Sequence, residues 1–259
     1  MDGSSWADLL CRDEDLGYAR SRTKFLSGEG LRLDESYRLA HLPLVAPEHP
    51  DVIAARDGAY GTYYDRGRHD RLYALGVPID PDALERSEPF RELDDTLRKS
   101  VFAHKIARAA QERRRDKLHA TVCHTMSVGT PWIVTAGQRE QLAALGPIKI
   151  EVRGLFSGNK NVGRLYLKLY PECRDGENLL HRIQRMFGRP PHDLPLAGLY
   201  NLTDHLDPTE AAALAEIIER WWHRPLLRFE ADLLWNLSAL DDMVLDGAVE
   251  ELIPLTPGS

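Results

Sequence analysis

A histidine and a threonine stand two positions apart in a short apolar run, Leu118-His119-Ala120-Thr121-Val122. Side chains two positions apart in a β-strand project to the same face, so His119 and Thr121 would share one side of a strand here. The three apolar side chains would then pack into a core on the other side. An imidazole exchanges a proton near neutral pH, and a hydroxyl donates a hydrogen bond to an anionic oxygen. The pair therefore predicts acid–base chemistry on one face of a strand.

The sequence around this run predicts an α+β domain that positions the pair. Alternation and turn residues predict strands over residues 117–123, 148–155, 163–170, 196–203, 226–237 and 249–255. Thr135 is a suitable N-cap for one helix, and Pro208 is typical of the first turn of another. The elements after residue 196 repeat the order of those before it, so we expect two similar halves.

The part of the chain before this domain carries no catalytic motif. We expect a mostly irregular extension over residues 1–89, a basic helix over residues 90–116 and the domain itself over residues 117–259. The basic end of the helix either complements the helix dipole or forms a rim that attracts phosphate. In the extension, residues 59–71 mix tyrosines with arginines, and they form either a cover over a nucleotide-like ligand or a packing loop.

Composition narrows the class of protein. The 259 residues carry a net charge of −7, which argues against a protein that coats nucleic acid through bulk charge and favours a small partner. The three widely spaced cysteines indicate neither a disulfide framework nor a metal site. No leader-like segment and no run of about 18 apolar residues is present. We therefore expect a cytoplasmic protein that enters no membrane and needs no metal or cofactor.

The order of elements from residue 117 onward resembles the two-histidine (2H) phosphoesterase superfamily. That superfamily includes bacterial cyclic-nucleotide phosphodiesterases and RNA 2′-5′ ligases. The resemblance is carried by His119-Ala120-Thr121, the strand 163–169, the helix opening at Pro208 and the closing segment 252–255. It implies a bilobal LigT-like fold, in which two antiparallel sheets flanked by helices each contribute a His-x-Thr/Ser motif to a cleft. The implied ligand is a small phosphorylated molecule, a nucleotide or an RNA end.

The resemblance also implies roles for the first motif. Hydrolysis of a 2′,3′-cyclic phosphate needs a base that activates water and an acid that protonates the leaving oxygen. His119 would exchange the proton, and Thr121 would contact the phosphoryl oxygens.

The second motif is incomplete. Asn201-Leu202-Thr203 stands where a second His-x-Thr is expected, and an amide cannot exchange a proton near pH 7. The resemblance assigns Asn201 and Thr203 to the second catalytic positions. Tyr200 and His205 are alternative partners from the same region, and Tyr200 is also a candidate for substrate binding.

Several other polar residues either belong to this site or lie on an ordinary surface. Arg164, Tyr166 and Lys168 alternate onto one strand face, where they either line the cleft and bind substrate or form an ordinary solvated surface. His124 lies five positions after His119, so a continuous strand would place it on the opposite face and exclude a metal site shared by the two. His192 and His205 are expected at the surface, and Asp241-Asp242 in a turn.

Three functions follow from these patterns. The first is a phosphoric diester hydrolase that acts on a cyclic phosphate or an RNA-end phosphodiester with a non-standard second catalytic residue. The second is a degenerate relative that binds a nucleotide or phosphate without turnover, which the missing second histidine favours. The third is an interaction scaffold, in which the N-terminal extension covers the cleft between the two halves.

Overall fold

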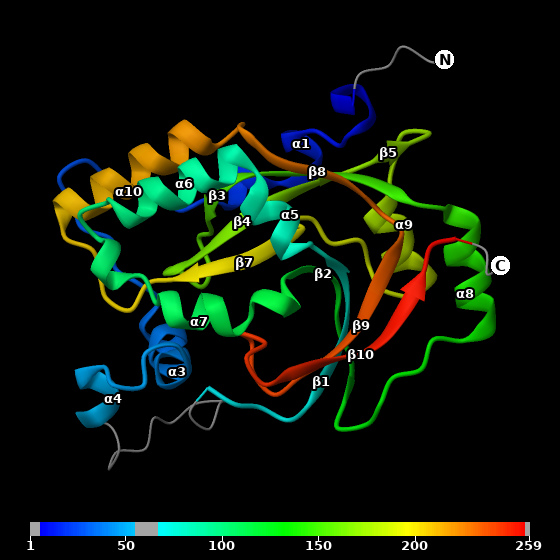
Figure 1. The fold of residues 1–259 in the computed structure, drawn as a ribbon, viewed down its shortest axis with the longest axis horizontal. Helices are drawn as coiled ribbons and strands as arrows, with labels where there is room; N and C mark the ends of the chain where they lie inside the picture. The colour runs from blue at the N-terminus through cyan, green and yellow to red at the C-terminus, as the bar shows by residue number, and fades with distance from the viewer. Residues whose placement is uncertain (1–5, 55–66, 257–259) are drawn as a thin grey trace.

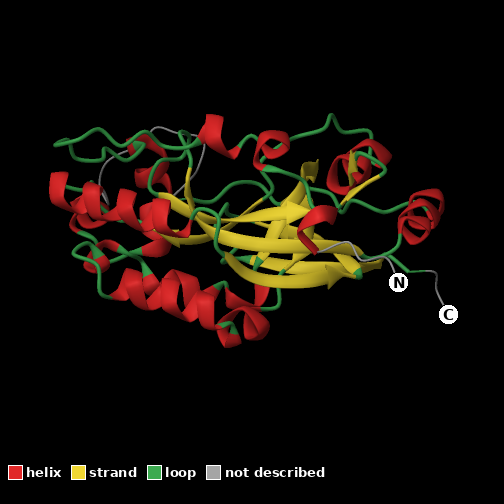
Figure 2. Cartoon of the chain, turned by 90° about the horizontal axis from the view of Figure 1, so that it is seen from above, coloured by secondary structure: helices red, strands yellow, loops and turns green. Residues whose placement is uncertain are grey.

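The computed structural model describes residues 6–54 and 67–256. Within these residues the chain forms two four-stranded antiparallel sheets, a two-stranded ribbon and ten α-helices, so the predicted α+β class is confirmed. The strands form a central layer with helices on both sides (Figure 2). The cover predicted over residues 59–71 falls mostly on residues 59–66, which lie outside the described residues, and it stays a prediction.

The first sheet contains the strand with the His-x-Thr motif. Its order is β10 (Gly247–Pro254), β9 (Leu233–Ala239), β1 (Leu72–Pro78) and β2 (His119–Val128), and all neighbours are antiparallel. The predicted domain boundary at residue 117 is therefore wrong in one respect. Strand β1 comes from the predicted extension, yet it lies between β9 and β2 and is part of the sheet.

The second sheet has the order β7 (Leu196–Asn201), β4 (Arg164–Pro171), β3 (Ile148–Ser157) and β8 (Pro225–Ala231). The predicted antiparallel pairing of β3 with β4 is confirmed. The edge strands β2 and β7 contact each other, so the two sheets meet along a seam (Figure 1). The single strand predicted over residues 226–237 is instead β8 and β9, one in each sheet.

The remaining elements surround the sheets. The helices are α1 (Asp13–Leu16), α2 (Tyr18–Ser21), α3 (Glu35–Val45), α4 (Pro50–Ala54), α5 (Pro81–Arg86), α6 (Glu88–Arg98), α7 (Arg108–Arg113), α8 (Ala136–Leu145), α9 (Leu179–Met186) and α10 (Pro208–Trp221). Short 3-10 turns are η1 (Trp6–Leu9), η2 (Ala103–Lys105) and η3 (Arg115–Lys117), and the ribbon is β5 (Cys173–Arg174) with β6 (Glu177–Asn178).

Two predicted helix starts are confirmed. The Thr135 hydroxyl accepts a hydrogen bond from the Gln138 backbone N–H at 3.3 Å, and the Gln138 side chain accepts one from the Thr135 N–H at 3.0 Å. This reciprocal capping box begins α8. Pro208 lies in the first turn of α10, where its missing N–H leaves no hydrogen bond unmade.

The long basic helix predicted over residues 90–116 is wrong. The segment breaks after α6 and resumes at α7, with η2 between them. Ile106 forms an isolated β-bridge with Leu202, and the Ala107 N–H donates to the Asn201 carbonyl at 2.9 Å. These hydrogen bonds to the end of β7 replace helical ones, so α6 and α7 become two helices that flank the seam.

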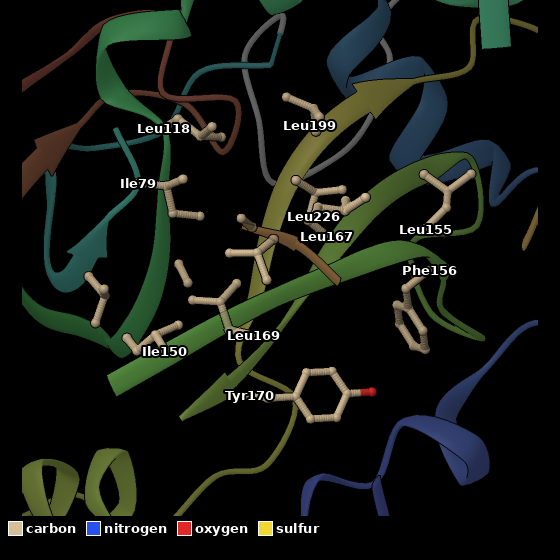
Figure 3. Close-up of a cluster of buried hydrophobic side chains, with 14 of the residues drawn as sticks. Ile79, Leu118, Ile150, Leu155, Phe156, Leu167, Leu169, Tyr170, Leu199 and Leu226 are labelled. Atoms are coloured by element: carbon tan, nitrogen blue, oxygen red, sulfur yellow. The ribbon is translucent and has the colours of Figure 1, made fainter. Parts of the chain in front are cut away.

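The core lies on the apolar face of the seam. Leu118, directly before β2, and Ala120 and Val122 of β2 are buried, as their alternation predicts. Ile79 and Leu118 face Leu167 of β4 in this core (Figure 3). Full burial of one such leucine stabilises the fold by about 1.5–3 kcal/mol. The packing therefore fixes β2 so that its other face is available for polar side chains.

Candidate functional site

A cavity of about 550 Å³ lies along the seam, on the opposite face from this core; we call it the seam cavity. His119 and Thr121 line it from the first sheet, and Arg164 and Tyr166 line it from the second. The volume falls within the range of about 300–1,000 Å³ that small-molecule sites occupy. The structure thus brings together four of the residues singled out from the sequence.

Hydrogen bonds fix the orientation of the His119 ring. Its Nδ1 lies 2.7 Å from the Lys117 carbonyl oxygen, which can only accept, so Nδ1 carries the proton. Its Nε2 lies 3.3 Å from the Thr121 hydroxyl oxygen and is left as an acceptor. The ring packs over Gly76 of β1, where a Cβ would approach ring carbon Cδ2 to 2.9 Å. Glycine at that position gives the ring its space.

The surroundings of His119 favour its neutral form. Burial lowers the pKa of His119 to about 4, and the charges of Arg164 and Arg114 act in the same direction. At neutral pH the ring is therefore unprotonated, with Nε2 as a proton acceptor in the seam cavity.

Contacts with Tyr37, Tyr166 and Gly198 hold the Arg164 guanidinium in place. Its Nη1 donates to the Tyr37 hydroxyl of α3 at 3.2 Å, and its guanidinium lies 5.4 Å from the centre of the Tyr166 ring. The guanidinium also lies directly against Gly198 of β7, where any Cβ would overlap it. Within residues 6–54 and 67–256, no carboxylate forms an ion pair with Arg164.

A second arginine, Arg114, lines the same cavity. The sequence placed it in the basic end of the 90–116 segment, one interpretation of which was a rim that attracts phosphate, but did not single it out. It is buried, its Nη2 donates to the Leu199 carbonyl, and its Nη1 lies 3.6 Å from the Met243 sulfur. Its Nε has no hydrogen-bond partner in the described part of the chain. Burial, together with the charge of Arg164, lowers the pKa of Arg114 to about 9. Buried charges are normally paired, so two guanidinium groups without a carboxylate partner among the described residues mark a site for an anion.

Acidic residues stand elsewhere on the cavity wall. The Asp241 carboxylate accepts hydrogen bonds from the backbone N–H groups of Leu245 and Asp246 at 3.0 and 2.8 Å, which confirms the predicted turn. Asp242 lies 3.4 Å from Nε2 of both His41 and His69. The carboxylates thus have partners of their own, and their charges also act on the arginines, that of Asp242 on Arg164 and that of Asp241 on Arg114.

A substitution at Gly198 tests the anion site directly, because the Arg164 guanidinium occupies the space where a Cβ would lie. Gly198→Ala is expected to displace the Arg164 guanidinium and to weaken binding of inorganic phosphate by about tenfold or more, because charge-assisted hydrogen bonds contribute about 1.5–3 kcal/mol. Isothermal titration calorimetry measures the affinity. Gly137→Ala is the matched control, since a Cβ at Gly137 of α8 would meet nothing within 4 Å. Equal affinities for the two variants would show that Arg164 does not bind the anion.

The predicted second motif does not line the seam cavity. The Thr203 hydroxyl donates to the Asp204 carboxylate at 2.8 Å and lies 3.3 Å from the Lys105 carbonyl oxygen, and Asn201 is buried among residues of α3. The Tyr200 hydroxyl donates to Asp94 at 2.9 Å. The groove predicted between His119 and these residues is therefore bounded by Leu196 and Gly198 instead.

An irregularity in β7 explains the position of Tyr200. Tyr166 pairs with Gly198 and Leu165 pairs with Tyr200, so Leu199 is an extra residue in the β7 strand. An extra residue reverses which side chains face each side of a sheet. Tyr200 consequently shares the core face with Leu165.

Lys168 also lies away from the seam cavity, which corrects its prediction as a substrate-binding residue. It is fully buried, and its Nζ donates to the Trp222 carbonyl at 2.6 Å and lies 3.6 Å from the centre of the Trp222 ring. The Tyr18 ring, from the N-terminal segment, lies 5.4 Å from the same Nζ. The N-terminal segment and the end of α10 thus cover this half of the β4 face.

Burial lowers the pKa of Lys168 to about 7, below its ordinary value of 10.5. Between these values the unfolded chain binds the proton and the folded chain does not, so this residue makes stability rise with pH from about 7 to 10.5. Lys168→Met is expected to remove that rise and to be at least as stable as wild type at pH 7, since methionine fills similar space without a charge. Urea unfolding at pH 7 and 9.5 measures both effects. A loss of more than about 2 kcal/mol at pH 7 would instead mean that the contacts of the ammonium outweigh its desolvation.

Two further imidazoles reach the seam cavity. Leu75 pairs with Cys123 and Gly76 pairs with Thr121, so Val122 is an extra residue in β2. The prediction that His124 faces away from His119 assumed a continuous strand and is wrong, since both residues line the cavity. Nothing in the sequence of β2 predicts this extra residue, which forms a β-bulge.

His192 is exposed at the surface, as predicted, and it also lines the cavity. Its ring lies 5.8 Å from that of His124 in an edge-to-face arrangement. The buried Gln184 side chain accepts from the His192 N–H at 2.8 Å and donates to the Val122 carbonyl at 2.9 Å. Gln184 therefore ties the His192 loop to the β2 bulge. The remaining candidate, His205, accepts a hydrogen bond from the Leu33 N–H at 3.1 Å and does not line the cavity.

No protein-family model matches the chain, and a search of curated proteins found no match. The chemistry of the site therefore rests on the side chains that line the cavity. No group of three or more His, Cys, Asp or Glu side chains in residues 6–54 and 67–256 has an arrangement suited to a metal ion. None of the helices in these two ranges has the length and apolar character needed to span a membrane.

Proposed function

We propose that the protein binds a phosphodiester in the seam cavity and hydrolyses it as a relative of the 2H phosphoesterases. The substrate class is a 2′,3′-cyclic phosphate or an RNA-end phosphodiester. One observation carries the proposal. The first sheet presents the unprotonated His119 Nε2 and the Thr121 hydroxyl to the cavity. The second sheet presents Arg164, which has no ion-pair partner among the described residues. Two antiparallel sheets that meet along β2 and β7 also support a bilobal LigT-like arrangement.

The chemistry follows from the side chains. The guanidinium groups of Arg164 and Arg114 and the Thr121 hydroxyl bind the non-bridging phosphoryl oxygens. His119 Nε2 takes a proton from water as the water oxygen bonds to phosphorus. The bound phosphate faces His119 and raises its pKa from about 4 toward neutrality, which makes the ring a stronger base in the complex.

The bond from phosphorus to the leaving oxygen then breaks, and that oxygen takes up a proton. His124 is our candidate for the donor, because it supplies a second imidazole to the same cavity while Asn201 does not. Burial lowers the pKa of His124, so the ring first takes up a proton from solvent, which the negative charge of the bound phosphate favours, and then gives that proton to the leaving oxygen. The products are a phosphomonoester and a free hydroxyl, and proton exchange with solvent restores both rings.

A phosphate-binding protein without turnover is the second candidate. It is favoured by the distance of Asn201 and Thr203 from the cavity, since the second motif of the superfamily then contributes nothing to catalysis. The scaffold hypothesis is disfavoured, because a covered cleft would not leave a cavity of about 550 Å³.

Incubation with 2′,3′-cyclic AMP separates these candidates. Phosphorus NMR is expected to detect conversion to a monoester by the wild-type protein, and calorimetry is expected to detect binding. Binding without conversion would support the second candidate. Neither binding nor conversion, with RNA ending in a cyclic phosphate giving the same result, would overturn the proposal.

A further inference from the structure

A second cavity, of about 360 Å³, lies next to the seam cavity and shares Arg114 and Leu118 with it; we call it the helix cavity. It exists because the segment predicted as one helix folds back, which places α6 and α7 on either side of a space beside the start of β2. Its floor is apolar and is formed by the buried side chains Leu84, Phe90, Leu118 and Leu199. The cavity is thus large enough for a ring-sized ligand and has an apolar surface for it.

The polar wall of the helix cavity carries an unsatisfied donor. Asp94 accepts hydrogen bonds from Arg98 Nε at 2.6 Å, from Arg108 Nη1 and from the Tyr200 hydroxyl at 2.9 Å. The other terminal nitrogen of Arg108, Nη2, is buried and has no hydrogen-bond partner in the described residues. A buried N–H without an acceptor is unfavourable, because the group has lost its hydrogen bonds to water without gaining another. This nitrogen therefore points to an acceptor that a ligand supplies.

The charges on the wall do not balance. Two guanidinium groups, Arg98 and Arg108, share the single carboxylate of Asp94. Arg115 has its own partners in Asp82 and Glu85. Arg114 lines both cavities and faces the anion of the seam cavity, so its charge is not counted here. One negative charge on a ligand would balance the two guanidinium groups that share Asp94.

We propose that the helix cavity is a second ligand site, which takes a small aromatic monocarboxylate. The ring packs on the apolar floor, and a carboxylate oxygen accepts a hydrogen bond from Arg108 Nη2. A phosphate fits this site less well, because the floor is apolar and the excess charge is a single one. The proposal does not depend on the function proposed for the seam cavity.

Binding of 2-naphthoate to the full chain tests this site, with calorimetry as the readout. Wild type is expected to bind 2-naphthoate at least tenfold more tightly than the neutral analogue 2-naphthalenemethanol. Gln111→Trp is expected to abolish binding by filling the cavity from its half-buried rim, whereas Gln111→Ala retains it. Arg108→Gln is expected to weaken binding at least tenfold.

A variant of the other cavity separates the two sites. Arg164→Met removes a guanidinium that lines only the seam cavity, so it is expected to leave 2-naphthoate affinity unchanged. Loss of binding in Arg164→Met, or retention in Gln111→Trp, would place the probe elsewhere and overturn the inference. Equal affinity for the acid and the alcohol would do the same, because it would exclude recognition of the charge.

Discussion

Replacing His119 with glutamine is expected to lower kcat/KM for 2′,3′-cyclic AMP by about 100- to 10,000-fold, the usual contribution of a general base. Glutamine keeps a hydrogen-bonding side chain against Thr121 but cannot accept a proton from water near pH 7. Initial rates of monoester formation measure the effect.

His104→Gln is the matched control for this experiment. His104 lies on η2, its side chain is 67% exposed and it lines neither cavity, so the same chemical change there is expected to leave kcat/KM unaltered. Equal rates for wild type and His119→Gln would remove the general base from the proposed mechanism. The cavity would then be a binding site alone.

Replacing Arg164 with methionine is expected to lower kcat/KM by about 100- to 1,000-fold, as removal of one preorganised donor to a developing anion does. Methionine fills the space beside Gly198 and Tyr166 without a charge, so the loss reports on electrostatics more than on packing. Arg164→Lys is expected to recover part of the activity, since lysine restores the positive charge but cannot form the bidentate hydrogen bonds of a guanidinium.

Urea unfolding of the Arg164 variants separates a binding effect from a folding effect. Both variants are expected to unfold within about 1 kcal/mol of wild type, because the guanidinium lacks a carboxylate partner among the described residues and methionine keeps the apolar contacts. Full activity in Arg164→Met would contradict a phosphoryl contact by this residue.

Local patterns predicted much of the scaffold. The alternation of β2 indicated which face carries His119 and Thr121, the Thr135 capping box marked the start of α8, and Pro208 marked that of α10. These features depend on hydrogen bonds and burial between residues near in sequence. For the same reason the strand pair of β3 and β4 could be predicted.

The errors arose where contacts distant in sequence decide the local structure. The extra residues Val122 and Leu199 reverse the faces of β2 and β7, and this brings His124 into the cavity while it turns Tyr200 away. The bridge from Ile106 to β7 breaks a helix whose own periodicity was adequate. Arg114 was not singled out because it is the middle residue of a run of three arginines, and only its burial beside the seam distinguishes it.

The account depends on one claim, that a phosphate binds between His119 and the arginines of the seam cavity. NMR of imidazole-labelled protein measures the pKa of His119 directly, with and without inorganic phosphate. We predict a pKa of about 4 in the free protein. Saturating phosphate is expected to raise the pKa to between about 5 and 7, because the anion stabilises the imidazolium and screens Arg164 and Arg114. A pKa near 6.5 that phosphate leaves unchanged would contradict the account.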